Sequence, residues 1–367
     1  MSGRLKLRRG VVVGEEPLTV EVDGERRPAW ADTNLLGEMR EGDEVIVNVA
    51  ALDLGLGSGG FDVVHVNLTR GLDASGESDE HVMKLNYTSL QHPVEPVEPS
   101  ACETHRTGGK YRWERVGASM PVLVLPLHGH LAPAAWAAAQ APPPQPQHVF
   151  HPWDGKRVGE LGFRVGYVQT GGGALPGSLS RDVAELRQRG LLCDHITAAP
   201  AYGGEREALS VAGALDAAAN SLGWDAALVG PGPGIIGSDT RLGHGGLAAL
   251  DSAHAALALG LPTLLSPRLS EADSRERHRG LSHHTLTVLE LLLGGVGVVV
   301  PSGNSQAAAQ LADATGGRHR LHEAQPDVAG YASSGLSART MGRGLDEDRL
   351  FFEAALAAGT HLARART

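Results

Sequence analysis

The chain has little cysteine and no excess of positive charge, and each shortage excludes a class of protein. Two cysteines, Cys102 and Cys193, are too few for a disulfide framework and lack the paired spacing of a structural zinc site. A reducing cytoplasm is therefore the expected compartment. The 32 basic residues are outnumbered by 42 acidic ones, a net charge of −10. We therefore expect no general binding to nucleic acid or to an anionic membrane surface.

Long hydrophobic segments are also missing. The longest apolar stretch, residues 286–300, contains Glu290 and is interrupted by glycines, which is too broken for a membrane span. Residues 1–10 are basic and lack an apolar segment, so no secretory signal is expected. At 367 residues the chain is long enough for about two domains, each with a core of its own.

The N-terminal part has the pattern of strands and tight turns. Residues 5–13 and 18–22 alternate or are rich in β-branched side chains, Asp23-Gly24 is a hairpin signal, and residues 45–47 form another β-branched run. This pattern predicts a small β-barrel, followed by a connector. We assign residues 1–118 to this β-rich domain.

From residue 119 the pattern changes to apolar strands that alternate with helices. Strands are expected at residues 122–125, 163–169, 194–198, 226–229, 263–265 and 296–300. Continuous apolar strands joined by helices predict an α/β fold with a doubly wound, mainly parallel, Rossmann-like sheet. We assign it to residues 119–367, with a proline-rich insertion at 141–160 and a last helix over about 346–362.

The carboxyl ends of parallel strands are where ligands bind in such sheets. A run of three glycines, Gly171, Gly172 and Gly173, follows one expected strand. Its amides are candidates for holding an anion, although the run matches neither the dinucleotide fingerprint nor the P-loop. A tight turn without a ligand is the alternative.

The loop at residues 230–246 is too long for a simple strand-to-helix connection, which favours a functional role. Its candidate ligand-binding residues are Gly232, Gly234, Thr240 and Arg241. Asp239 and His244 are candidate catalytic residues, with His244 exchanging protons and Asp239 assisting. A shaped loop in which Asp239 pairs with Arg241 is the alternative.

A second long loop, residues 266–281, is rich in arginine. Arg268, Arg277 and Arg279 are candidates for binding a phosphate or carboxylate, and a solvated charge run is the alternative. His283 is a third candidate catalytic residue, and with His284 it falls in the first turn of the next helix, where the helix dipole favours neutral imidazole. Adjacent helical residues diverge by about 100°, so one ring is expected at the ligand and the other in the core.

Histidines also suggest a divalent metal. His128 and His130 follow the first strand of the sheet, and together with His278 and His284 they are the candidate metal ligands. Hydrogen-bonded structural histidines are the alternative.

Three segments resemble one known family when they are taken together. They are residues 168–176, 230–240 and 277–285, and the likeness extends over most of the chain, including residues 340–344. They resemble the bacterial family of domain of unknown function 3866. The resemblance implies one unit over the whole length and carries no activity.

Three functions are consistent with these residues. The first is a cytoplasmic protein that binds a small anionic ligand, phosphorylated or nucleotide-like, at the carboxyl-end loops. An enzyme that acts on this ligand is one version of this hypothesis, and a protein that only binds it is the other. The second is a metal-dependent hydrolase that uses His128, His130, Asp239 and a histidine of residues 278–284. The third is a non-catalytic regulatory or assembly protein, and for all three a homo-oligomer is expected.

Overall fold

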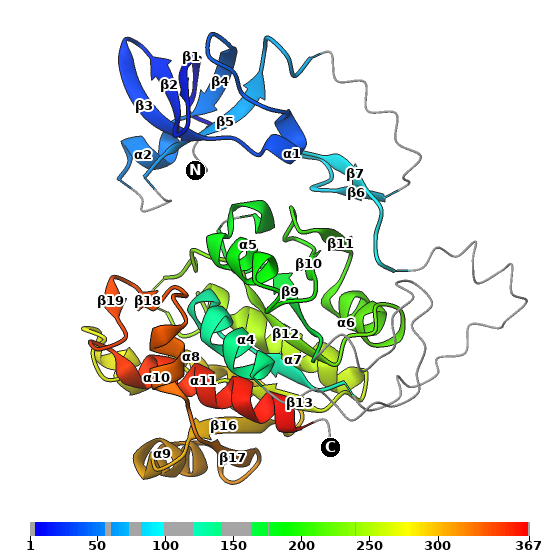
Figure 1. Cartoon of the computed structure of the whole chain (residues 1–367), viewed down its shortest axis with the longest axis vertical. Coiled ribbons are helices and arrows are strands. Elements are labelled where there is room, and N and C mark those ends of the chain that lie inside the picture. The colour runs from blue at the N-terminus through cyan, green and yellow to red at the C-terminus, as the bar shows by residue number, and fades with distance from the viewer. Residues whose placement is uncertain are drawn as a thin grey trace, which may run out of the picture. The chain divides into compact units, whose positions relative to one another are not determined.

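The computed structural model describes residues 4–55, 60–72, 82–98, 120–140, 163–174, 176–238 and 240–365. The chain divides into two compact units, Met1–Val94 and Glu95–Thr367 (Figure 1). The expected boundary at 118/119 and the insertion at 141–160 lie outside the described residues. Among the described residues, no helix has the length and apolar character needed to cross a bilayer.

The first unit is a closed five-stranded barrel, as the β-rich pattern predicted. Its strands are β1 (Leu7–Glu15), β2 (Leu18–Val22), β3 (Glu25–Trp30), β4 (Glu44–Asn48) and β5 (Asp62–Asn67). They pair in the order β1-β2-β3-β5-β4. Alternate valines such as Val20, Val22, Val45 and Val47 point inward and make the core. The short helices α1 (Thr33–Leu36) and α2 (Ala50–Asp53) and the hairpin β6 (Val82–Lys84) and β7 (His92–Val94) complete the unit.

The second unit is built on one eight-stranded sheet whose neighbouring strands are all parallel. The order across the sheet is β11-β10-β9-β12-β8-β13-β16-β17. The strands are β8 (Val122–Val124), β9 (Val165–Thr170), β10 (His195–Ala198), β11 (Arg206–Ala208), β12 (Ala226–Pro231), β13 (Thr263–Leu265), β16 (Gly297–Pro301) and β17 (Arg320–Ala324). This confirms the expected doubly wound α/β sheet.

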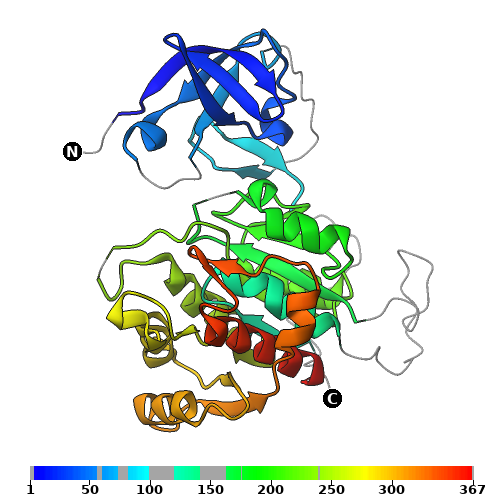
Figure 2. The same cartoon turned by 60° about the vertical axis from the view of Figure 1, so that its left-hand side comes forward.

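Helices cover both faces of the sheet, each over its own apolar core (Figure 2). One face carries α4 (Leu131–Ala139), α5 (Arg181–Gln188), α10 (Val328–Ser333) and most of α11 (Arg349–Arg364). The other carries α6 (Val211–Asn220), α7 (Ala248–Ala258), α8 (His283–Leu291) and α9 (Ser305–Thr315). The loops that connect the strands to these helices lie at the carboxyl ends of the strands, where the candidate site is found.

Two strands of the sheet were not expected from the sequence. The strand β11 has only three residues, two of them charged, and β17 reads Arg-Leu-His-Glu-Ala. Both lie at the edges of the sheet, each next to a single strand of it, and several of their side chains are exposed or half-buried. Their sequences therefore lack the continuous apolar character of the central strands.

The central strand β8 lies between β12 and β13. The chain leaves β8 toward α4 on one face, and it leaves β12 toward α7 on the opposite face. Connections that diverge to opposite faces leave room for a ligand at the carboxyl ends of the strands. Three loops start at the carboxyl ends of these neighbouring strands: 125–130 after β8, 232–247 after β12 and 266–282 after β13.

Candidate metal centre

The segment between β13 and α8 folds into a small substructure at the carboxyl edge of the sheet. It contains β14 (Leu269–Ser270), the 3-10 turn η4 (Glu276–His278) and β15 (Gly280–Leu281), and β14 pairs with β15 in antiparallel fashion. Ser282 follows β15 and begins α8 as its N-cap, because its Oγ accepts a hydrogen bond from the amide of His284 at 3.2 Å. The same Oγ lies 2.7 Å from Nδ1 of His278.

Three histidine rings meet where this segment enters α8. One ligand atom from each of His278, His283 and His284 can be chosen so that all three lie within 4.8 Å of one another. The ring centroids are 5.0 Å apart for His278 and His283, 4.7 Å for His278 and His284, and 4.4 Å for His283 and His284. We call these three residues the histidine cluster.

The cluster corrects one detail expected from helical geometry. His283 and His284 were expected to diverge, with one ring in the core, but both rings join the cluster. They stand at the first two positions of α8, where no preceding turn of helix covers them. The 100° rotation between them therefore does not force either ring into the core.

A fourth ring reaches the cluster from the loop after β12. His244 stacks on His284 with a centroid distance of 3.5 Å and an interplanar angle of 11°. Its backbone is fixed by an isolated antiparallel bridge to Gly237 and by the 3-10 turn η3 (Gly245–Leu247) that follows. The residue is buried, with 7% of its surface exposed.

Burial keeps these rings neutral near neutral pH. Loss of solvation, followed by the nearby Arg268 charge, lowers the pKa of His278 to about 3. Loss of solvation, followed by the neighbouring His244, lowers the pKa of His284 to about 2. Burial is also the main cause that lowers the pKa of His244 and of His283. A neutral imidazole keeps a lone pair for a metal ion.

Two ring nitrogens of the cluster are buried and have no hydrogen-bond partner. They are Nε2 of His278 and Nε2 of His283. In His278 the other ring nitrogen is occupied by Ser282, so Nε2 is the atom left for a ligand. Buried polar atoms without a partner are uncommon in proteins and call for an explanation such as a bound ion.

The spacing of the rings suits a metal after a small adjustment. Nitrogen ligands at about 2.0 Å from a tetrahedral ion lie about 3.3 Å from one another. The cluster has its ligand atoms within 4.8 Å, so the rings have to move closer by about 1.5 Å at most. Side-chain rotation at the start of a helix can supply this movement.

The other histidines proposed as ligands lie outside the cluster. Nε2 of His128 is 3.0 Å from Oγ of Ser180, and its ring packs near Tyr167. Nδ1 of His130 is 2.9 Å from Oγ of Ser266, and its ring meets the edge of Phe351. The structure brings His278 and His284 together with His283, and it does not place His128 or His130 among them.

The arginines proposed for an anion lie in three different settings. Arg241 is exposed and pairs with Glu290. Arg277 and Arg279 are exposed in and just after η4. Arg268 alone is buried, with 2% of its surface exposed, and its charge acts on all three rings of the histidine cluster.

The glycine-rich loops pack on each other through their backbones. A Cβ at Gly173 would collide with the carbonyl group of Gly232, and one at Gly245 would collide with that of Gly172. The amide of Ala174 also donates to the carbonyl group of Gly234 at 2.9 Å. Close contact between the two loops is thus one reason for these glycines.

The remaining proposed residues of these loops take no part in the cluster. Gly171 packs against Pro200, where a Cβ would crowd the proline ring. Thr240 is exposed, and its hydroxyl lies 2.9 Å from that of Ser238. Asp239 lies outside the described residues.

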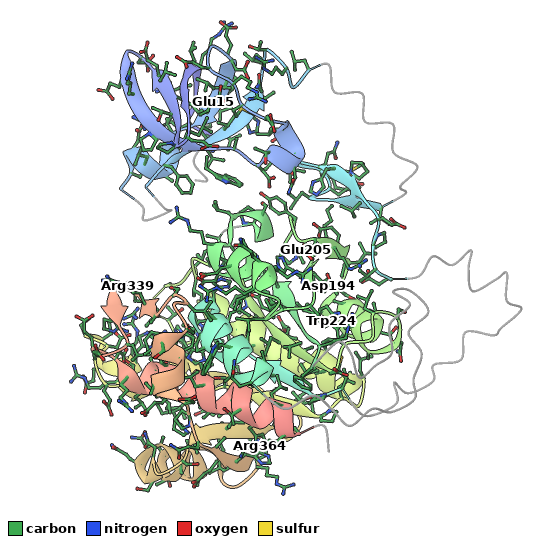
Figure 3. The ribbon with its side chains drawn as sticks, in the orientation of Figure 1. Glu15, Asp194, Glu205, Trp224, Arg339 and Arg364 are labelled. Atoms are coloured by element: carbon green, nitrogen blue, oxygen red, sulfur yellow. The ribbon has the colours of Figure 1, made fainter. Side chains whose placement is uncertain are left out.

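Acidic residues near β10 belong to ion pairs with arginines, away from the cluster. Asp194 pairs with Arg206 at 2.7 Å, and Glu205 pairs with Arg187 at 2.7 Å. Both carboxylates are labelled in Figure 3, on the side of the sheet that carries β10 and β11. Neither is a ligand for the cluster.

Sequence reasoning did not identify Ser282 as a functional residue, nor the stacking of His244 on His284. A signal for Ser282 was present, because serine directly before a helix is a typical N-cap. The stacking had no signal, since it depends on how the loop after β12 folds back over α8.

Comparison with known proteins gives a family and no activity. A family model described as "Protein of unknown function (DUF3866)" matches residues 28–359. Neither a curated protein nor a solved structure matches the chain.

Proposed function

This chain belongs to the DUF3866 family of proteins of unknown function, and we propose that it binds a divalent transition metal such as Zn²⁺ through the histidine cluster. The observation that carries the proposal is the meeting of three imidazole rings, of which His278 and His283 each have a buried, unpartnered Nε2. Imidazole nitrogen suits zinc and its neighbours in the first transition row.

The number of ligands favours a catalytic site over a structural one. Structural zinc sites have four protein ligands, whereas catalytic sites have three and keep a position for water or substrate. A metal in such a site lowers the pKa of a bound water and polarises a carbonyl or phosphoryl oxygen. We therefore propose metal-dependent hydrolysis of a small molecule as the reaction class.

The residues around the cluster have supporting roles in this proposal. Ser282 holds the ring of His278 through Nδ1, the kind of outer contact that orients metal ligands. His244, neutral and stacked on His284, is the group that exchanges protons with the substrate. Binding of a small anion, a cytoplasmic location and homo-oligomerisation remain predictions from the sequence.

The test is metal stoichiometry in single variants. The chain is treated with chelator, given Zn²⁺ or Co²⁺, desalted and analysed for metal and for the visible absorption of bound Co²⁺. We expect one metal per chain, lost in His278→Ala and His283→Ala. His254→Gln is the matched control, because His254 lies on α7 outside the cluster and its Nε2 accepts a hydrogen bond from the amide of Leu293 at 3.1 Å. Equal metal content in all four proteins would refute the proposal.

A further inference from the structure

A buried arginine lies beside the histidine cluster and is held in place by its backbone. The amide of Arg268 donates to Oγ1 of Thr285 at 2.9 Å, and its carbonyl group accepts from the amide of Ser282 at 3.0 Å. Both partners belong to the start of α8, the element that carries two rings of the cluster. Arg268 is therefore fixed next to the cluster.

The guanidinium of Arg268 is incompletely paired. Its Nη2 donates to Asp273 at 2.9 Å, and Sδ of Met341 lies 3.6 Å from the same atom. Its Nε is buried and has no hydrogen-bond partner. Asp273 also pairs with Arg275 at 2.9 Å and with Arg343 at 3.5 Å, so its single negative charge is divided among three cations.

A second buried nitrogen without a hydrogen-bond partner belongs to His130, whose ring is close enough to Arg268 to feel its charge. His130 is fully buried, and its Nδ1 contacts Ser266, two residues before Arg268. Its Nε2 has no hydrogen-bond partner. When the Ser266 hydroxyl donates to Nδ1, Nε2 carries the proton and becomes a donor.

We propose that Arg268, through Nε, and His130, through Nε2, bind the oxyanion group of the substrate, a carboxylate or a phosphoryl group, beside the metal. A buried guanidinium whose carboxylate is shared calls for further negative charge. Guanidinium and oxyanion also match in geometry. The backbone of Arg268 is bonded to the start of α8, whose positive helix end also favours an anion.

This inference rests on the proposed function, because the anion site is a substrate site only if the histidine cluster binds a catalytic metal. It differs from the sequence-based anion hypothesis because it requires the buried Arg268 and none of the exposed arginines. Arg241, the loop residue also proposed for an anion, already has Glu290 as its partner. The substrate class that follows is a small carboxylate or phosphate ester.

The test is anion binding to the whole chain, measured by titration calorimetry. Inorganic phosphate and acetate are titrated separately into chelator-treated chain and into chain loaded with one Zn²⁺ and desalted. The variants are Arg268→Gln, and Arg349→Gln as the control. Arg349 is an exposed arginine on α11 that pairs with Glu353. Metal content and circular dichroism are recorded for each protein.

We expect the wild type and Arg349→Gln to bind at least one of the two anions. Arg268→Gln is expected to bind it about ten- to a hundredfold more weakly while keeping its zinc, because a charged hydrogen bond is lost. Preference for phosphate indicates a phosphoryl substrate, and preference for acetate indicates a carboxylate. If Arg268→Gln fails to fold, Arg268→Lys replaces it, since lysine keeps the charge and lacks Nε–H of the guanidinium.

Two results would overturn the inference: wild-type anion affinity in the Arg268 variants, or a wild type that binds neither anion. A chain that binds an anion through Arg268 but takes up no metal would refute the proposed function alone. The two proposals therefore fail separately.

Discussion

One hydroxyl group contributes both to the start of a helix and to the orientation of a candidate ligand. Oγ of Ser282 caps α8 and contacts His278, and Ser282 is fully buried. Removal of the hydroxyl leaves an amide of the first turn without its partner and frees the ring of His278 to rotate. Stability and metal affinity are therefore linked at this residue.

We predict that Ser282→Ala lowers the free energy of unfolding by about 1 kcal/mol. Its zinc affinity is expected to fall about tenfold or more, as for other groups that orient a ligand. Chemical denaturation and competition with a chromophoric chelator measure the two effects. Ser210→Ala is the matched control, because Ser210 caps α6 away from the cluster. It should lose a similar stability and keep the zinc affinity of the wild type.

Asp273 is the residue whose charge the arginines around it share. Burial by itself raises its pKa, but hydrogen bonds from Arg275 and the charge of Arg268 outweigh burial and hold the pKa well below its usual range. In the unfolded chain an aspartate titrates near pH 3.9, at about its ordinary value. Its contribution to stability is thus fully present above that pH and is lost as the pH falls toward the folded pKa.

We predict that Asp273→Asn destabilises the second unit by about 3 kcal/mol at pH 7, because buried guanidiniums lose their carboxylate. The difference from the wild type should shrink as the pH is lowered from about 5 to about 2. Urea unfolding at several pH values measures it. A difference that is constant over this range would contradict the role given to the charge.

At the scale of elements, α11 packs against α4 through a glycine. A Cβ at Gly359 would collide with the backbone carbonyl group of Ala134. Both helices contribute fully buried side chains to the core on this face of the sheet. The close approach fixes the distance between the two helices, and no larger residue fits.

We predict that Gly359→Ala destabilises the chain by about 2 kcal/mol, even though alanine is the better helix former. Thermal and chemical unfolding measure the change. Gly14→Ala is the control, since a Cβ there meets only ordinary contacts, the nearest at 3.5 Å. Unchanged or increased stability of Gly359→Ala would show that the helices can separate without loss.

Strands that are buried on both faces were predicted from the sequence, and edge strands were not. The strands β8, β9, β10, β12, β13 and β16 were expected close to their observed positions because both faces of a central parallel strand are buried. The edge strands β11 and β17 carry charged residues and gave no such signal. Their pairing depends on neighbours distant in sequence.

The candidate site was predicted in part. Its place at the carboxyl ends of the strands follows from the topology, and His278, His283 and His284 were candidates because they flank a helix start. Contacts such as His244 with His284, or Ser180 with His128, link segments 40 and 52 residues apart. No local pattern encodes such distances, so His128 could not be separated from the cluster by sequence alone.

At the scale of the whole molecule, the barrel and the α/β unit each have a core of their own, and every residue of the candidate site belongs to the second unit. We predict that a fragment of residues 95–367 folds alone and binds one zinc ion. Circular dichroism, cooperative unfolding and metal analysis measure this. An unfolded fragment would show that the barrel is required for folding.

The three ligands of the histidine cluster lie within residues 278–284. Closure of so short a loop has a small entropic cost, and the unfolded chain can also gather these rings around an ion. Such a chelating peptide competes with the native site, and binding to the unfolded chain reduces the stabilisation that a ligand gives. The zinc affinity of the native chain therefore sets an upper limit on the rise in melting temperature that zinc causes. The ion can remain bound to the unfolded chain after the sheet has unfolded.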